Sequence, residues 1–176
     1  IVVAVNSAMT DVAQRSLEGL SNVRMVSGGG ERQDSIANAV DALQSDAQLV
    51  LVHDAARPCV TTSIIERVLI EAERVGAAIP AIPVADTIKR IDESNTILET
   101  IDRTSLRRAQ TPQGFRREVL VEAYAYARAT GIVATDDASL VEALGHPVSV
   151  VAGDESNIKI TRDIDFMIAE QLLSRR

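Results

Sequence analysis

Residues 49–58 read Leu-Val-Leu-Val-His-Asp-Ala-Ala-Arg-Pro, and no other stretch says as much about the fold of this chain. The continuous apolar run lacks a helical period and stops at Asp54, which is typical of a buried parallel strand whose carboxyl end opens into a loop. Open α/β sheets bind their ligands at that end of the strands. Asp54 can hold a hard metal ion there, and Arg57 can bind a phosphate or a carboxylate through its guanidinium group. The alternative is a turn that is closed by a local ion pair between these two side chains.

Strand and helix patterns alternate along most of the chain. This alternation predicts an α/β fold with a mostly parallel sheet that helices cover on both faces, in a single domain over residues 1–176. Strands are expected at residues 1–5, 23–26, 48–53, 77–83 and 147–151, and helices near residues 10–20, 31–43, 63–75, 116–129, 136–144 and 162–174.

One segment breaks the alternation and predicts a β-hairpin. Residues 87–90 and 96–101 are rich in Thr and Ile, and they flank the polar residues 92–95 as two strands flank a turn. A two-stranded hairpin is only marginally stable in water unless it packs on something. We therefore expect residues 84–105 to form a β-arm that packs on another surface, with a second copy of the chain as the candidate; a hairpin folded back on its own sheet is the alternative. The side chains expected to be buried in this way are Ile88, Ile91, Ile97, Leu98 and Ile101.

The composition limits the classes of function. The net charge is −7, from 18 basic and 25 acidic residues, and 2% of the residues are aromatic. The chain therefore lacks a general basic surface and has few side chains that stack on bases, which argues against nucleic-acid binding. Any anionic ligand must be held by a local cluster of basic side chains. The single cysteine, Cys59, excludes an internal disulfide and suits a reducing compartment. No apolar run approaches the roughly 18 residues that span a bilayer, and no signal sequence is visible, so we expect a soluble cytoplasmic protein that does not bind membranes.

Several further features are ambiguous when each is taken alone. Residues 28–30 are three glycines between an expected strand and an expected helix, and such a loop serves either close approach to a ring or a phosphate or an ordinary turn. Ser35, just beyond, suits a base or a sugar as well as solvent. Lys159 precedes the last helix and is either a point charge for a phosphate or a solvated lysine. Residues 135–137, Thr-Asp-Asp, are by default the N-terminal cap of a helix.

Six motifs follow one another along the chain. They are Gly-Gly-x-Glu-Arg-x-Asp-Ser (28–35), Val-His-Asp-Ala-Ala-Arg-Pro (52–58), Pro-Val-x-Asp-Thr-Ile-Lys (83–89), Asp-Arg-x-x-Leu-x-x-x-Gln-Thr-Pro-Gln (102–113), Thr-Asp-Asp-Ala-Ser (135–139) and Asn-Ile-Lys-Ile-Thr (157–161). In this order they resemble the 2-C-methyl-D-erythritol 4-phosphate cytidylyltransferase family over nearly the whole chain. The resemblance implies a three-layer α/β/α Rossmann-like nucleotidyltransferase fold. It also implies transfer of CMP from CTP to methylerythritol phosphate, with release of pyrophosphate, in the non-mevalonate route to isoprenoids.

The same resemblance implies roles for individual residues in a homodimeric enzyme. Asp54 would be a ligand of Mg²⁺ or another divalent cation and, with Lys159, a catalytic residue. The cytosine and ribose of CTP would be surrounded by Gly29, Gly30, Ser35 and Ala55. Arg57, Thr87, Thr135 and Lys159 would meet the substrate or the phosphates. Arg103 and Thr111, on and just after the hairpin, would hold methylerythritol phosphate from the neighbouring subunit.

The chain departs from the family pattern at its front. Members of the family begin with a strand and a Gly-rich loop whose arginine and lysine wrap the triphosphate of CTP, and no such motif precedes residues 28–30 here. We therefore expect that an amino-terminal segment with the principal grip on the triphosphate is missing. Two alternatives follow: another nucleotidyl- or sugar-nucleotide transferase of the same fold, and an inactive dimerising fragment.

Overall fold

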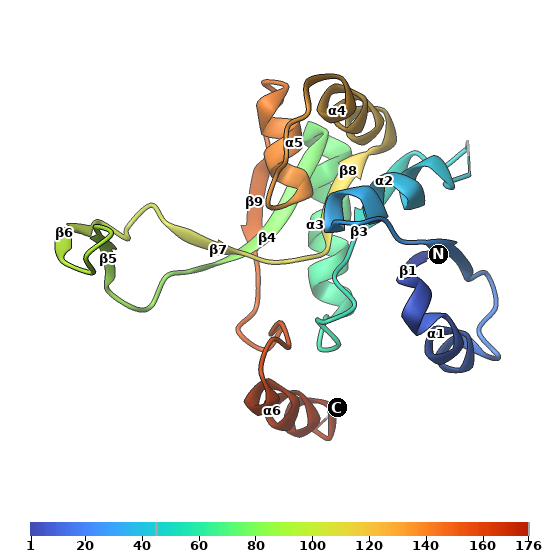
Figure 1. Cartoon of the computed structure of the whole chain (residues 1–176), viewed down its shortest axis with the longest axis horizontal. Helices are drawn as coiled ribbons and strands as arrows, with labels where there is room; N and C mark the ends of the chain where they lie inside the picture. Colours follow the sequence, from blue (N-terminus) through green and yellow to red (C-terminus); the bar gives the residue numbers. More distant parts are fainter. Residues whose placement is uncertain (45, 176) are drawn as a thin grey trace.

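The computed structural model describes residues 1–44 and 46–175 and has a mixed α/β architecture (Figure 1). The main sheet contains β3, β8, β4 and β7 in that order, with β9 also paired to β4, while β1–β2 and β5–β6 form separate two-stranded sheets. In chain order the elements are β1 (Val2–Val5), a short 3₁₀ helix (Ser7–Met9), α1 (Thr10–Leu17), β2 (Arg24–Ser27), α2 (Arg32–Asp41), β3 (Leu49–Val52), α3 (Thr62–Val75), β4 (Ala77–Pro83), β5 (Ile88–Ile91), β6 (Ile97–Ile101), β7 (Arg107–Ala109), β8 (Gln113–Arg116), α4 (Arg117–Thr130), α5 (Asp137–Ala143), β9 (Ser149–Ala152) and α6 (Asp163–Leu173).

The strand directions in the main sheet differ from the prediction. β8 lies between β3 and β4 and is antiparallel to both, and β7 is antiparallel to β4. Within the described residues the parallel pairs are β4–β9 and β1–β2. The expectation of a mostly parallel sheet is therefore wrong, and the sheet is mixed. Because β8 is antiparallel to both neighbours, β3 and β4 still run in the same direction, so their carboxyl ends meet that of β9 at one edge of the sheet.

Helices cover both faces of the main sheet, as predicted. Gly114 and Phe115 are consecutive in β8, so they face opposite sides of the sheet. A Cβ atom at Gly114 would contact Val68 of α3, whereas Phe115 packs in the core cluster that α4 and α5 complete. α3 therefore lies on one face, and α4 and α5 lie on the other. The larger side chains of this core are Val50, Val52, Phe115, Leu120, Tyr124, Leu140 and Val141.

The close approach of α3 to β8 requires a glycine at position 114. A Cβ there would lie 2.5 Å from Cγ1 of Val68 and 3.1 Å from Cδ2 of Leu51. We expect Gly114→Ala to lower the free energy of unfolding by about 1–3 kcal/mol, because a well-packed core does not accept an added methyl group without strain. Urea denaturation measures this change. The matched control is Gly30→Ala, where the nearest atom to the added Cβ is Oδ2 of Asp34 at 3.7 Å; an equal loss in both variants would contradict the packing argument.

The predicted hairpin is present and projects from the body of the molecule (Figure 1). Within the described residues β5 and β6 pair with each other and with no other strand, so the alternative of a hairpin folded back on its own sheet is wrong. The turn is closed by Asp92, whose carboxylate accepts hydrogen bonds from the backbone N–H groups of Ser94 and Thr96. Ile91, Ile97 and Leu98 of the arm are 50%, 59% and 61% exposed. The arm thus presents apolar side chains to solvent in the single chain.

An apolar cavity lies between β1 and β3. β1 and β2 form a parallel pair that α2 packs against. The cavity has a volume of about 630 Å³ and is lined by residues 1–4 of the first strand region, by residues 49–55 and by the inner side of α2.

None of the helices in the described part of the chain combines the length and the apolar content needed to cross a membrane.

Candidate functional site

The loop after β3 places Asp54 at the edge where the strands end. Val52 pairs with Gln113 in the antiparallel ladder of β3 and β8, so Asp54 falls opposite Thr111 two residues further along. The backbone N–H of Asp54 donates a 3.1 Å hydrogen bond to Oγ1 of Thr111. The carbonyl of Thr111 accepts a 2.9 Å hydrogen bond from Nδ2 of the fully buried Asn157. The strand ladder thus fixes the backbone on which the Asp54 carboxylate stands.

Two cations contact the carboxylate of Asp54. Nζ of Lys159 lies 2.8 Å from Oδ2, and Nε of Arg32 lies 3.4 Å from Oδ1. The predicted alternative of a local ion pair with Arg57 is wrong, because the turn is closed through the backbone: the N–H of Arg57 donates to the carbonyl of Asp54 at 2.9 Å. The guanidinium of Arg57 instead donates to the carbonyl of Asn157 at 2.7 Å.

These neighbours set the protonation state of Asp54. Partial burial disfavours the charged carboxylate, but the hydrogen bond and the charge of Lys159, followed by those of Arg32, outweigh this cost and hold the pKa of Asp54 below its usual value. The carboxylate is therefore ionised near neutral pH. The Asp54 carboxylate, with two cations beside it, can therefore contact a charged ligand without a change in its own protonation state.

Two cavities open on either side of the pair formed by Asp54 and Lys159. Asp54 and Ala55 line the apolar cavity of about 630 Å³, together with Ser35. Lys159 and Arg57 line a second cavity of about 370 Å³. The other charged side chains of this second cavity are Arg108, Arg162, Glu155 and Asp165. The first cavity is lined mostly by apolar side chains and the second by more cations than anions, and Asp54 and Lys159 line one cavity each.

The glycine loop is held in place by Ser35. The N–H of Gly29 donates a 3.0 Å hydrogen bond to Oγ of Ser35, and that hydroxyl donates in turn to the carbonyl of Glu31 at 3.1 Å. A Cβ atom at Gly29 would overlap with Asp34, whereas a Cβ atom at Gly30 would make only an ordinary contact, 3.7 Å from Oδ2 of Asp34. Packing within the loop therefore explains the glycine at position 29 but not the glycine at position 30.

The residues present fit a divalent cation only when other ligands come with it. Within residues 1–44 and 46–175, no group of three or more His, Cys, Asp or Glu side chains is arranged to hold a metal ion. Asp54 offers one carboxylate, and Mg²⁺ typically keeps several waters and takes phosphate oxygens beside one or two carboxylates. A cation bound to a nucleotide triphosphate thus fits this site, whereas a free cation lacks ligands.

Comparison with known proteins identifies the family of this chain. The family model described as IspD, 2-C-methyl-D-erythritol 4-phosphate cytidylyltransferase, matches residues 1–175. The chain belongs to this family. A cytidylyltransferase of this name from Bacillus cereus is 48% identical over 151 residues, which cover 86% of this chain and 66% of that protein. One from Frankia casuarinae is 43% identical over 176 residues, which cover 99% of this chain and 64% of that protein. The matched part of the chain therefore spans slightly less than two thirds of these relatives.

Solved structures of the family have the same fold. The crystal structure of the cytidylyltransferase from Thermus thermophilus is 37% identical, with a TM-score of 0.81, and the match covers 96% of this chain and 89% of that chain. The crystal structure of the 4-diphosphocytidyl-2C-methyl-D-erythritol synthase from Anaerococcus prevotii is 31% identical, with a TM-score of 0.90, and the match covers 99% and 81%. The fold of this chain, with its mixed sheet, is therefore the fold of the cytidylyltransferase family.

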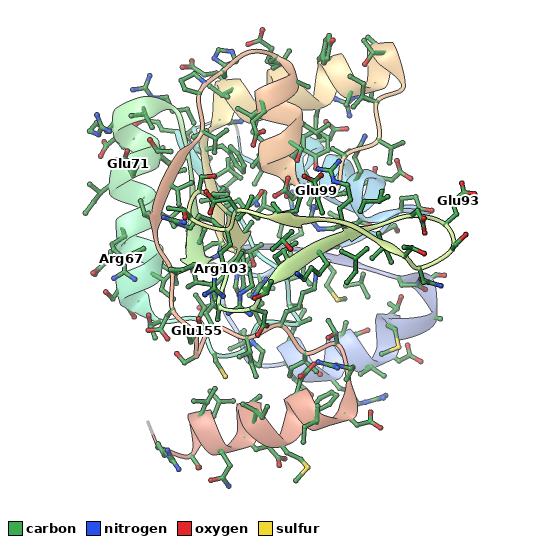
Figure 2. The ribbon with its side chains drawn as sticks, turned by 90° about the vertical axis from the view of Figure 1, so that its left-hand side faces the viewer. Arg67, Glu71, Glu93, Glu99, Arg103 and Glu155 are labelled. Atoms are coloured by element: carbon green, nitrogen blue, oxygen red, sulfur yellow. The ribbon has the colours of Figure 1, made fainter. Side chains whose placement is uncertain are left out.

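Three other residues that the family resemblance singled out, Thr87, Arg103 and Thr135, make no hydrogen bond or ion pair with Asp54 in the described part of the chain. Thr87 and Arg103 lie at the root of the arm, and a guanidinium nitrogen of Arg103 donates to the carbonyl of Ala85. Figure 2 places Arg103 and Glu93 at opposite ends of the hairpin. Thr135 is exposed just before Asp136, which caps α5 by accepting a 3.0 Å hydrogen bond from the N–H of Ser139. The predicted capping role of residues 135–137 is therefore confirmed.

Thr111 lies elsewhere than expected. The sequence grouped it with Arg103 as a residue that reaches the neighbouring subunit, but in the structure it is 5% exposed and contacts Asp54 of its own chain. Its hydroxyl also lies 3.0 Å from Nδ1 of His53. The physical reason is the antiparallel register of β3 and β8, which the sequence pattern did not indicate. Thr111 therefore contacts Asp54 within one chain.

Sequence reasoning missed the residues behind Asp54. Arg32 stands in the first quoted motif, but no role was predicted for it, and Tyr124 was not considered at all. Nη2 of Arg32 donates to Oδ2 of Asp137 at 2.8 Å, and the hydroxyl of Tyr124 donates to Oδ1 of Asp137 at 2.6 Å. One signal in the sequence was available: Tyr124 is one of two tyrosines in a chain with 2% aromatic residues.

Proposed function

We propose that this chain transfers CMP from CTP to 2-C-methyl-D-erythritol 4-phosphate and releases pyrophosphate. The observation that carries the proposal is the pair of Asp54 and Lys159 between an apolar cavity and a cationic one, at the strand ends of a chain in the cytidylyltransferase family. In this reaction an oxygen of the substrate phosphate attacks the α-phosphorus of CTP, a new P–O bond forms, and the bond to the pyrophosphate leaving group breaks. The nucleophile is already an anion near neutral pH, so the site needs no general base. Its task is to hold two anions together and to neutralise the charge on the transferring group.

The cationic side of the site is proposed to bind the phosphates. Lys159 has three N–H donors, of which one faces Asp54 at 2.8 Å, so two remain for phosphate oxygens. Arg57 lines the same cavity, and its guanidinium has further N–H donors besides the one that binds the carbonyl of Asn157. These donors are proposed to bind phosphate oxygens. The exposed Thr135 is proposed to add a hydroxyl contact to the substrate, whereas the buried hydroxyl of Thr111 is already held by the backbone N–H of Asp54 and by His53.

The apolar side of the site is proposed to bind the nucleoside. Ala55 and Ser35 line this cavity. Gly30 is proposed to let a flat ring approach the backbone of the loop, because a glycine has no side chain in the way. The backbone of Gly29 completes the proposed pocket for the cytosine and ribose. Asp54 would hold a divalent cation that arrives with the triphosphate, and this cation would supply positive charge to the α-phosphate.

The β-arm is proposed to dimerise the protein and to complete the site in the partner. In such a dimer the exposed side chains of Ile91, Ile97 and Leu98 would be removed from water. Burial of apolar surface stabilises the dimer by roughly 25 cal/mol per Å². Thr87 and Arg103, at the root of the arm, are proposed to bind methylerythritol phosphate in the site of the other subunit. Residues 84–105 would then act as a dimerisation region within one domain.

A substrate panel tests the proposed reaction. CTP, UTP and ATP are each combined with methylerythritol phosphate or with a sugar 1-phosphate in the presence of Mg²⁺, and pyrophosphate and product are followed by ³¹P NMR. Product from CTP and methylerythritol phosphate alone is expected. Product from UTP and a sugar phosphate would favour another nucleotidyltransferase. Because the match spans 66% of the Bacillus cereus relative, the assay is run on this chain and on a chimera completed with the remaining residues of that relative, and absence of product from both would refute the proposal.

Arg103→Ala is expected to weaken the binding of one substrate selectively. Loss of a hydrogen bond to a charged group costs roughly 1.5–3 kcal/mol, so the KM for methylerythritol phosphate should rise about 10- to 100-fold while the KM for CTP changes little. Steady-state kinetics measure both constants. The matched control is Arg90→Ala, which removes an arginine of the same arm that pairs with Glu99 at 2.7 Å. Equal changes in both KM values would contradict the assignment.

Mixing two variants, each with low activity when methylerythritol phosphate is far below its KM, tests whether the arm acts in the partner's site. A chain with Arg103→Ala is mixed with a chain with Asp54→Asn under conditions that exchange subunits. In a heterodimer one of the two composite sites draws Asp54 from the first chain and Arg103 from the second, so partial activity should return. If activity stays low after exchange has been verified, the arm serves its own chain.

A further inference from the structure

A buried carboxylate lies behind the proposed site and is held from two elements. The side chain of Asp137, at the start of α5, is 0% exposed. Its Oδ1 accepts a 2.6 Å hydrogen bond from the hydroxyl of Tyr124 on α4, and its Oδ2 accepts a 2.8 Å hydrogen bond from Nη2 of Arg32 on α2. Burial and the Asp137 carboxylate raise the pKa of Tyr124, so its hydroxyl remains protonated and able to donate. A fully buried carboxylate is very costly without its partners, so both contacts are held firmly.

The start of α5 is itself fixed to the central sheet. Gln113 of β8 is 1% exposed and donates a 2.8 Å hydrogen bond from Nε2 to Oδ2 of Asp136. Its Oε1 accepts a 2.9 Å hydrogen bond from the N–H of Ala138. Asp137 lies between Asp136 and Ala138, which both bind Gln113. Its position is therefore determined by the buried sheet and not by solvent-exposed groups.

Arg32 connects this buried anchor to Asp54. The same guanidinium that donates to Asp137 through Nη2 lies 3.4 Å from Oδ1 of Asp54 through Nε. Oδ1 faces Arg32, and Oδ2 faces Lys159 at 2.8 Å. Arg32 thus contacts the Asp54 oxygen that is turned away from Lys159.

We infer that Arg32 is a positioning residue for Asp54: its guanidinium, anchored on the buried pair of Asp137 and Tyr124, fixes the orientation of the Asp54 carboxylate between the two cavities. The planar fork of arginine can contact two carboxylates at once, whereas the single ammonium of lysine at the same position cannot span both with the same geometry. Misplacement of a reacting or binding group by about 1 Å can cost about a hundredfold in rate. The consequence for turnover rests on the proposed cytidylyl transfer, whereas the orientation of Asp54 does not.

The competing explanation is that Arg32 only neutralises Asp137. In that case its loss lowers the stability of the fold and leaves Asp54 where it is. The two explanations therefore differ in what happens to Asp54 in a variant that remains folded. Arg32→Lys keeps the positive charge beside Asp137, and Tyr124→Phe removes one hydroxyl at the far end of the chain of contacts.

The kinetic test compares these variants with matched controls at a temperature at which all of them are folded. We expect Arg32→Lys to lower kcat by about 10- to 100-fold with little change in the KM for CTP, and Tyr124→Phe to lower kcat by a smaller factor in the same direction. The controls are Arg128→Lys, in an exposed pair with Asp41 at 3.3 Å, and Tyr126→Phe, on the same helix as Tyr124. Both controls should retain the kcat of the unmodified chain. A kcat for Arg32→Lys within about twofold of that value, with a lower melting temperature, would overturn the inference.

A structural test separates this inference from the proposed reaction. Crystal structures of the unmodified chain and of Arg32→Gln and Tyr124→Phe report the position of the Asp54 carboxylate directly. A rotated or disordered Asp54 in Arg32→Gln supports the inference even if no substrate pair gives product. An Asp54 carboxylate that superposes on that of the unmodified chain overturns it even if the chain is an active cytidylyltransferase.

Discussion

Asp54→Asn is expected to lower cytidylyl transfer by about a thousandfold or more, which corresponds to roughly 4 kcal/mol of barrier stabilisation. The substitution keeps the shape of the side chain and removes its charge. Lys159 and Arg32 then lose the anion that holds them at 2.8 Å and 3.4 Å, and a divalent cation on the triphosphate loses its carboxylate ligand. Steady-state kinetics with CTP and methylerythritol phosphate measure the loss.

The control for this variant makes the same chemical change in a surface ion pair. Asp41→Asn breaks the pair with Arg128 at 3.3 Å, where both side chains are more than half exposed, and it should leave turnover unchanged. Turnover of Asp54→Asn within about tenfold of the unmodified chain, a loss of only about 1.4 kcal/mol, would refute the role of Asp54. Calorimetry adds an independent measurement: Mg²⁺ should bind in the presence of CTP and not in its absence, because Asp54 alone supplies too few ligands.

The position of Asp54 at a strand end could be predicted from the sequence because it depends on one buried strand. The apolar run of β3 has no helical period, so its carboxyl end is readable without knowledge of the rest of the sheet. The predicted sheet was wrong in its strand directions, but Asp54 still lies at the expected end of β3. The strands β3, β4 and β9 run in the same direction, because β8 lies between β3 and β4 and is antiparallel to both, while β9 is parallel to β4.

β8 itself could not be predicted from periodicity. It reads Gln-Gly-Phe-Arg, which is neither an apolar run nor a clear alternation, and its glycine and the preceding Pro112 are typical of turns. Its strand conformation is imposed by tertiary packing, since Gly114 lies against α3 and Phe115 fills the core on the other face. Thr111 and Asp54 are in contact because β3 pairs with β8. Since the sequence did not predict β8, it did not predict this contact either.

The contacts behind Asp54 lie beyond sequence reasoning for a different reason. Arg32 and Asp137 are 105 residues apart, and nothing local in either segment indicates that they meet. Tyr124 points into the core like any other apolar position of α4, and its hydroxyl acquires a role only because Asp137 is buried beside it. A charge that is neutralised at long range leaves no periodic pattern. The arm, by contrast, was predicted to within about one residue because a hairpin is a local structure.

Lys159→Ala is expected to lower turnover by several orders of magnitude with little effect on folding. Its ammonium group lies beside the cavity that Arg57 also lines, where it can stabilise charge on the transferring phosphoryl group through the two N–H donors that Asp54 does not use. Preorganised donors of this kind are typically worth a factor of about 10²–10³ each. The side chain is 44% exposed, so its removal leaves no large cavity, and the free energy of unfolding should change by less than about 1 kcal/mol.

The chain offers a matched control for this variant because it contains two lysines, Lys89 and Lys159. Lys89 lies on the arm, where its ammonium donates to the hydroxyl of Thr100 at 2.6 Å, and Lys89→Ala should retain most of the turnover. Lys159→Arg keeps the charge but changes the position of the donors, so an intermediate rate is expected if the ammonium acts at a defined point. The solvated-lysine explanation makes the opposite prediction, namely equal and small effects at both positions. A large fall in melting temperature for Lys159→Ala with nearly unchanged turnover would instead assign Lys159 a structural role, in which it does no more than neutralise Asp54.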